Sequence, residues 1–250
     1  MIKNILSDFL LMVQFMTRLP VNLSLPCESR NFKRGASMLP LVGLIIGGLQ
    51  WVVFFLAVKA LPLKAAAALV VLLGVLLTGA LHIDGLGDTC DGFYAFKGRE
   101  KIIEIMKDSR IGTYACLAIV FDILLKYSGI ASLPSLNKGM IIIAVPVISR
   151  ATQVLLFSIG NTAKSTGSGN LFIGNVGKSE ALIALAMAML IAAPLLGIKV
   201  ASLLFIAAIA VTLCFNYYCD KKIGGLTGDT LGANNELVEF VVLIMYLAII

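Results

Sequence analysis

Three aspartates that directly follow a long apolar segment form the most informative chemical pattern in the sequence. They are Asp84, Asp88 and Asp91, in the run His-Ile-Asp-Gly-Leu-Gly-Asp-Thr-Cys-Asp-Gly at 82–92. If the helix of the apolar segment continues, spacings of four and three residues put all three carboxylates on one face. Like charges so close repel, whereas a divalent cation would bind them, and hard oxygen ligands suit Mg²⁺. The pattern predicts a magnesium site, with a solvated, charged helix end at a membrane surface as the alternative.

His82 is the only histidine of the chain and lies beside the first of these aspartates. Imidazole titrates near neutral pH, so His82 is a candidate general base or a neighbour of the metal. The alternative is a structural histidine at a helix end.

A second polar segment, Lys-Asp-Ser-Arg-Ile-Gly-Thr-Tyr at 107–114, leads into the next apolar segment. The guanidinium of Arg110 can bind phosphate oxygens bidentately, which makes it a candidate for catalysis and substrate binding. Asp108 either orients Arg110 or joins the metal ligands. The alternative is a basic anchor at the membrane surface with a helix cap.

The third polar segment runs from 224 to 236 and reads Gly-Gly-Leu-Thr-Gly-Asp-Thr-Leu-Gly-Ala-Asn-Asn-Glu. Such a glycine-rich turn, which includes Gly228, presents backbone N–H groups to an anion, and Asp229 is a further metal ligand or a base. Asn234, Asn235 and Glu236 begin the last apolar helix, where we expect them to bind substrate. The alternative is a loop with a helix cap, which explains the asparagine pair well.

Two charged residues fall inside predicted membrane spans. Charge within a span is costly, so Arg150 is a candidate substrate-binding residue. Asp122 is weaker as a candidate, because Lys126 follows four residues later and can pair with it.

The composition determines which elements must position these residues. The chain has 250 residues, of which 59% are hydrophobic and only 14% charged, and its mean hydropathy is +0.98. Soluble domains carry about 25% charged residues. We therefore expect an all-α, polytopic membrane bundle of about six or seven transmembrane helices, forming one catalytic domain over residues 1–250.

Apolar segments long enough to span a bilayer lie at about 38–58, 65–81, 111–127, 139–159, 181–197 and 199–218. A shorter run at 237–250 is either a seventh span or a re-entrant helix. Residues 1–20 predict an amphipathic helix that lies at the membrane interface or against the bundle, since Asp8 interrupts its apolar stretch. The five cysteines are scattered and predict no disulfide framework.

Basic residues are distributed unevenly between the predicted loops. Fourteen of the 20 Lys and Arg residues fall on one side, in the segments around 1–34, 97–110, 164–178 and 221–222. Since Lys and Arg accumulate in cytoplasmic loops, the three polar loops at about 82–110, 160–178 and 219–236 should face the cytoplasm. Anionic lipid headgroups and phosphorylated substrates explain the net charge of +6, and no nucleic-acid partner is expected.

Five motifs in this order resemble the cobalamin synthase (adenosylcobinamide-GDP ribazoletransferase) family. They are Phe-Met-Thr-Arg-Leu-Pro at 15–20, Met-Leu-Pro-Leu-Val-Gly at 38–43, and the segments at 82–92, 108–114 and 224–236. The resemblance implies a magnesium-dependent transferase of the cytoplasmic (inner) membrane. It would join α-ribazole, or its 5′-phosphate, to adenosylcobinamide-GDP, forming adenosylcobalamin, or its phosphate, and GMP.

That chemistry agrees with the residues, because phosphoryl transfer depends mainly on positioning and charge neutralisation. A metal held by Asp84, Asp88 and Asp91 would neutralise the diphosphate, and Arg110 would hold the transferring phosphate. Asp229, Asp91 and His82 all stay candidates for accepting the proton of the attacking hydroxyl.

Two other functions compete with this one. The spaced aspartates are similar to those of CDP-alcohol phosphotransferases, but the Ala-Arg pair that follows the first Asp-Gly of that family is missing. A membrane transporter would carry polar residues in broken helices near the middle of the bilayer, whereas these aspartates lie at the ends of spans. The oligomeric state is not predictable from the sequence.

Overall fold

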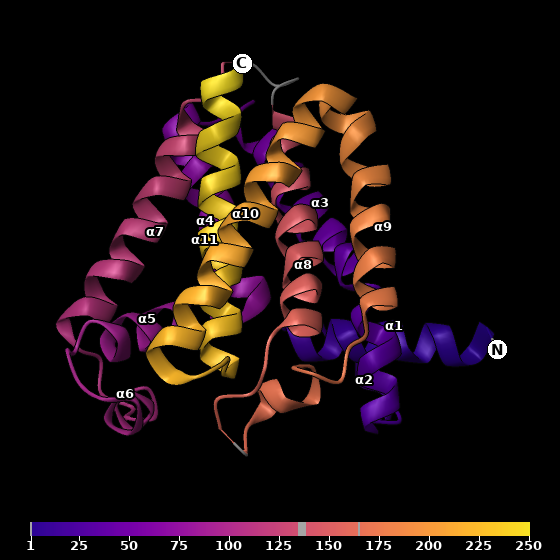
Figure 1. Ribbon diagram of the computed structural model, residues 1–250. Coiled ribbons are helices and arrows are strands. Elements are labelled where there is room, and N and C mark those ends of the chain that lie inside the picture. The colour runs from indigo at the N-terminus through magenta and orange to yellow at the C-terminus, as the bar shows by residue number, and fades with distance from the viewer. Residues whose placement is uncertain (1, 135–138, 165) are drawn as a thin grey trace.

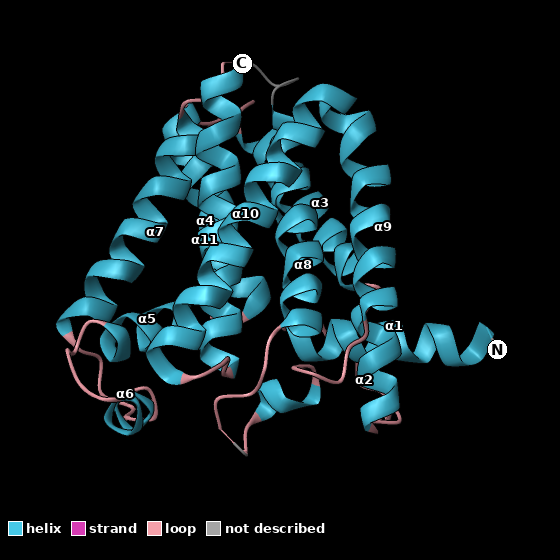
Figure 2. Ribbon diagram, viewed as in Figure 1, coloured by secondary structure: helices cyan, strands magenta, loops and turns pink. Residues whose placement is uncertain are grey.

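The computed structural model describes residues 2–134, 139–164 and 166–250, with side chains from residue 5 onward. Over these residues the chain is helical, and its only β feature is an isolated bridge between Thr162 and Leu226. This confirms the predicted all-α class (Figure 2).

Six helices are long and apolar enough to cross a membrane. They are α3 (Leu39–Ala57), α7 (Thr113–Ala131), α8 (Ile141–Ile159), α9 (Lys178–Leu196), α10 (Ile198–Ile223) and α11 (Gly228–Ile249). Five of them match predicted spans closely. The sixth, α11, begins at Gly228 rather than near 237, so the run at its end is part of a helix of full span length.

The second predicted span ends earlier than expected and does not continue into the aspartates. Helix α4 (Leu63–Thr78) stops at Gly79 and Ala80, which both have a positive φ, of 61° and 60°. The chain then turns by 88° into α5 (Leu81–Phe93). Since α5 is bent so far from the direction of α4, it crosses the end of the bundle instead of prolonging a span.

Helix α8 is the centre of the bundle, and its residues are buried from Val145 to Val154 without interruption. It packs against α3, α9, α10 and α11, while α7 lies on the outer side of α11 (Figure 1). Two apolar clusters surround α8, one towards each end of the molecule. A lipid-exposed outer surface agrees with this arrangement, because large apolar side chains such as Leu190 and Ile206 are exposed.

The short helices gather at one end of the bundle, opposite the C-terminus (Figure 1). This end carries α1 (Ile2–Met16), α2 (Ser29–Ala36), α5, α6 (Arg99–Ile105) and the 3₁₀ turn η2 (Ser168–Leu171). The turn between α10 and α11 also lies there, so the three polar segments do share one end, as predicted. Lys138, one of the Lys and Arg residues that are not among the fourteen predicted on this side, lies outside the described residues.

Helix α1 runs across this same end and projects beyond the bundle (Figure 1). Met12, Val13 and Met16 are buried, whereas Ile5 is 51% exposed. Asp8 is buried as well, and its carboxylate is compensated by hydrogen bonds that it accepts from Asn31 (2.7 Å) and Arg34 (2.7 Å) of α2. The apolar face of α1 therefore packs on the protein, and its position relative to a membrane stays a prediction.

Candidate active site

Two glycines bring α5 and α11 into direct backbone contact at the end of the bundle. A Cβ atom at Gly85 would lie 2.6 Å from the carbonyl oxygen of Asp229, and one at Gly232 would lie 3.1 Å from the Cα of His82. The contact at Gly85 leaves no room for a Cβ unless the backbone moves, and the contact at Gly232 is tight enough that a Cβ would require a small shift of α5. The two segments that carry the predicted aspartates, far apart in the sequence, are held against each other by this contact.

Asp84, Asp88 and Asp229 form an acidic cluster where α5 meets α11. Burial, and then repulsion from Asp84, Asp229 and Asp91, raises the pKa of Asp88 to about 7. Only one cation reaches the cluster among the described residues: Lys164, whose Nζ lies 3.5 Å from Oδ2 of Asp229. The cluster therefore has more negative charge than its neighbours compensate, which favours binding of an additional cation.

Lys164 was not among the sequence-predicted site residues. It comes from the loop after α8, and in the sequence analysis it counted only as one of the basic residues that indicate membrane orientation. The signal that could have identified it is its place in the polar loop at about 160–178, which was predicted to lie on the same side as the aspartates.

Asp91 also repels Asp88, but its carboxylate caps the start of another helix. Its carboxylate accepts hydrogen bonds from the backbone N–H groups of Gly112 (2.6 Å) and Ala115 (2.9 Å), at the start of α7. Within the described ranges, no three His, Cys, Asp or Glu side chains converge closely enough to hold a metal ion. Since α5 is helical from Leu81 to Phe93, its three aspartates do share one helical face, as expected. They do not converge on one point, because the carboxylate of Asp91 is bound at the start of α7 while Asp229 approaches Asp84 and Asp88.

Arg110 and Asp108 lie on the surface next to Asp91. The guanidinium of Arg110 donates to Asp108 from Nη2 (2.6 Å) and Nε (3.0 Å), and the backbone N–H of Arg110 donates as well (3.1 Å); this pairing lowers the pKa of Asp108 to about 2. The side chain of Arg110 is 87% exposed. Both residues line a wide, open concavity with Asp91 and Gly112. Asp108 thus orients Arg110, one of the two roles predicted for it, and the guanidinium is accessible to a ligand.

Gly228 begins α11 and packs against η2. A Cβ atom at Gly169 of η2 would lie 2.7 Å from the backbone nitrogen of Gly228. The cap of α11 is Thr227, whose hydroxyl accepts from the N–H of Thr230 (3.3 Å). The glycine-rich turn is therefore shorter than predicted and ends before Asp229. Asn234 and Asn235 are fully buried in the second turn of α11, so they do not cap it.

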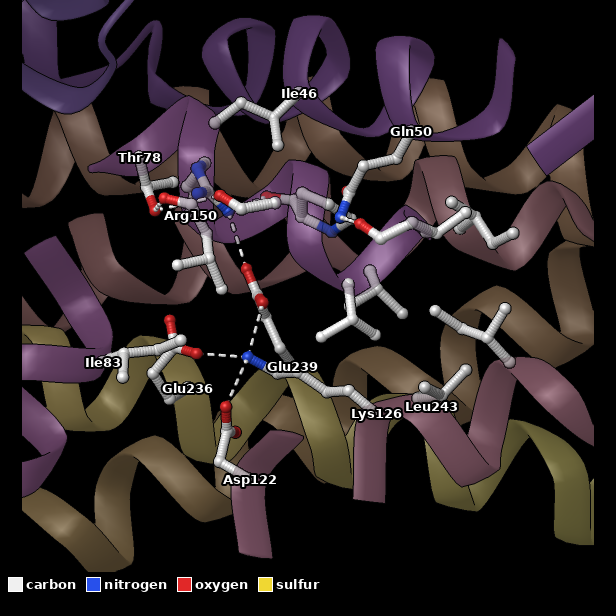
Figure 3. Close-up of a pocket in the computed structure, with 18 residues that line it drawn as sticks. Ile46, Gln50, Thr78, Ile83, Asp122, Lys126, Arg150, Glu236, Glu239 and Leu243 are labelled. Carbon is white, nitrogen blue, oxygen red and sulfur yellow. Dashed lines mark hydrogen bonds and ion pairs between the residues drawn. The ribbon is translucent and has the colours of Figure 1, made fainter. Parts of the chain in front are cut away.

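Arg150 and Glu236 also lie inside the bundle, in a network of charged side chains (Figure 3). Lys126 of α7 contacts Asp122 (3.2 Å), Glu239 (3.1 Å) and Glu236. Arg150 of α8 contacts Glu239 at 2.9 Å. The expected Asp122–Lys126 pair is confirmed, while Glu239 and the contacts of Lys126 with Glu236 and Glu239 were not predicted.

Asn235 joins this network by donating to Glu239 (3.1 Å), and Asn234 lies 3.4 Å from the hydroxyl of Thr212. His82 is 3% exposed and lies 3.9 Å from Glu236, between the network and the acidic cluster. Arg150 and Glu236 line a different cavity from the exposed Arg110. Substrate binding by Arg150, Asn234, Asn235 and Glu236 stays a prediction.

Known proteins match the chain along almost its entire length. The model of a family described as cobalamin-5-phosphate synthase matches residues 8–247. A protein of Clostridium tetani is 50% identical over 244 residues, 97% of each chain. One of Clostridium kluyveri is 51% identical over 251 residues, 99% of each chain. Both are named adenosylcobinamide-GDP ribazoletransferase. No solved structure matches the chain.

The matches cover the acidic cluster, the Arg110 segment and all the membrane-length helices, and they agree with the resemblance found in the five motifs. The chain belongs to the cobalamin synthase (adenosylcobinamide-GDP ribazoletransferase) family.

Proposed function

We propose that this protein is an adenosylcobinamide-GDP ribazoletransferase. It joins α-ribazole, or α-ribazole 5′-phosphate, to adenosylcobinamide-GDP and forms adenosylcobalamin, or its 5′-phosphate, and GMP. The observation that carries the proposal is the acidic cluster, in which Asp84 and Asp88 of α5 meet Asp229 of α11 at one end of a membrane bundle. The substrates are inferred from the family and from the names of its matching members.

Mg²⁺ suits this cluster, because it binds through one or two carboxylates together with substrate phosphates. Asp84 and Asp88 would hold the ion, and the raised pKa of Asp88 supports this, since the cluster lacks compensating charge. When bound, the ion supplies positive charge that neutralises the diphosphate. Asp91 is a weaker ligand candidate, because two backbone N–H groups already occupy its carboxylate.

The remaining polar groups have separate tasks. A hydroxyl oxygen of the ribazole bonds to the cobinamide phosphorus, while the bond from that phosphorus to the GMP oxygen breaks. Asp229 accepts the hydroxyl proton, because its side chain is partly exposed and, among the described residues, Lys164 is the one cation paired with it, whereas Asp91 caps a helix and His82 is buried. Arg110 and Lys164 bind phosphate oxygens.

The two competing functions are less well supported. A CDP-alcohol phosphotransferase would release CMP, and the full-length matches are to ribazoletransferases instead. A transporter would place its polar site near mid-bilayer. The charged groups buried inside the bundle contact one another, whereas the acidic cluster lies at the end of the bundle.

We further propose that the protein lies in the cytoplasmic membrane with the acidic cluster on the cytoplasmic side. The uneven distribution of Lys and Arg supports this orientation. Labelling of cysteines introduced at Lys97 and Lys199 tests it. In intact cells, a membrane-impermeant thiol reagent should modify only the cysteine at 199, and the opposite result would reverse the orientation.

The proposed activity is tested with purified protein in detergent, adenosylcobinamide-GDP, α-ribazole and Mg²⁺, with an EDTA sample as the control. Mass spectrometry should detect a corrinoid with the added ribazole, together with GMP in equal amount. No product with these substrates would refute the function, and full turnover in EDTA would refute the role of Mg²⁺.

A further inference from the structure

A pocket next to the acidic cluster extends from it into the bundle. Its volume is about 560 Å³ including its open mouth, within the range of small-molecule sites. Asp84 and Asp229 line the pocket together with apolar and aromatic side chains. Any ligand whose phosphates bind at the acidic cluster could therefore place an adjoining group here.

Aromatic rings form the apolar wall of this pocket. Phe157 of α8 and Phe172 after η2 are stacked, with ring centroids 4.7 Å apart and planes inclined by 24°. Phe15 packs edge-on against Phe172 at 5.5 Å. Met16 also lines the pocket. Flat apolar walls of this kind suit a planar ring, because bases stack on aromatic side chains.

Two buried polar side chains that line the pocket lack full hydrogen bonding. Gln153 is 2% exposed, and its Oε1 has no hydrogen-bond partner among the described residues. Its Nε2 donates only a long bond, 3.5 Å, to the carbonyl of Leu231. Both ring nitrogens of His82 likewise lack a partner in the described parts of the chain. Buried polar groups are nearly always satisfied, so these three atoms indicate a polar ligand.

We propose that this pocket binds the guanine base of the nucleotide that activates the corrinoid substrate, an assignment that rests on the proposed function. Guanine offers N–H donors at N1 and N2 to the acceptor Oε1 of Gln153, and its O6, N3 and N7 accept from a donor such as His82. Its flat ring suits the wall formed by Phe157 and Phe172. Its phosphates would extend towards Asp84 and Asp229.

The base of the ribazole is the rival occupant of the pocket. A benzimidazole ring linked to ribose has one free ring nitrogen, an acceptor, and no N–H donor. It would satisfy one nitrogen of His82 but leave Oε1 of Gln153 buried without a partner, which costs binding energy. The polar groups therefore favour guanine.

Equilibrium binding to the purified protein with Mg²⁺ tests the assignment, with GMP, AMP and α-ribazole as the ligands. Adenine has an acceptor at N1 where guanine has a donor, so wild-type protein should bind GMP at least about tenfold more tightly than AMP. The variant Gln153→Met should weaken GMP binding by about tenfold or more and leave α-ribazole binding within about twofold.

The matched control is Gln50→Met, the same chemical change at a glutamine that lies outside this pocket and donates to Val70. It should change neither affinity. A second variant, Phe172→Leu, removes one ring of the stack and should weaken GMP and AMP alike. Thermal unfolding in detergent shows whether each variant is folded.

Three results would overturn the assignment. The assignment fails if the wild-type protein binds GMP less than about twofold more tightly than AMP. If folded Gln153→Met lost only α-ribazole binding, the pocket would be assigned to the base of the ribazole instead. If GMP binding were unchanged in that variant, the pocket would not be the guanine site. Product formation by the wild-type protein separates these outcomes from failure of the proposed function.

Discussion

The buried ammonium group of Lys126 allows a quantitative test of what holds the helices together. It lies 3.2 Å from Asp122, 3.1 Å from Glu239 and in contact with Glu236, so it links α7 to α11. The substitution Lys126→Met keeps an apolar chain of similar length and leaves three buried carboxylates with Arg150 as their only cation among the described residues. Removing one partner of a buried ion pair costs about 3–5 kcal/mol. The free energy of unfolding should fall by that amount.

The assay is denaturant unfolding of the purified protein in mixed micelles, followed by loss of helical circular dichroism. The matched control is Lys101→Met. Lys101 pairs with Glu104 at 2.7 Å, but their side chains are 54% and 67% exposed, and exposed pairs contribute only about 0–1 kcal/mol. Adding Glu236→Gln to Lys126→Met should restore part of the loss, because it removes one uncompensated charge. A difference below about 1 kcal/mol between the two lysine variants would refute the reasoning.

Three further predictions concern the end of the bundle that carries the acidic cluster. Asp88→Asn should abolish GMP release while the protein still inserts into membranes and unfolds as the wild type does; wild-type turnover would exclude a role for Asp88 in binding a cation. Asp91→Ala should lower the free energy of unfolding by about 0.5–2 kcal/mol, since two N–H groups at the start of α7 lose their cap, and an unchanged unfolding curve would contradict this. Gly85→Ala should reduce turnover, because its Cβ would lie 2.6 Å from the carbonyl oxygen of Asp229 and force α5 away from α11. Gly48→Ala, which meets no atom within 4 Å, is the control, and equal activity of the two variants would show that the close contact is unimportant.

Much of the fold was predictable from composition and length. A chain with 59% hydrophobic and 14% charged residues cannot expose its helices to water, and each span needs a fixed length of apolar sequence. The break between α4 and α5 was not predicted. The apolar pattern runs on through Gly79 and Ala80, and only the backbone conformation there turns the chain by 88°.

The start of α11 was misjudged for a related reason. Its first turns carry Asp229, Asn234, Asn235 and Glu236, which resemble a polar loop in sequence. They are helical because Thr227 caps the first turn and because buried partners engage part of their polar groups: Lys126 contacts Glu236, and Glu239 accepts from Nδ2 of Asn235. Partners of this kind come from other helices and are invisible in the local sequence.

The sequence alone determined the residue types of the candidate site, their membrane setting and the family, since these depend on composition and on the order of motifs along one chain. Only the tertiary structure decided that Asp229 joins Asp84 and Asp88 while Asp91 caps α7, and that Arg150 and Glu236 lie in the interior. The physical reason is that helical spacing fixes a residue's direction within its own helix. Which residues meet depends on how helices far apart in the sequence bend and pack against one another.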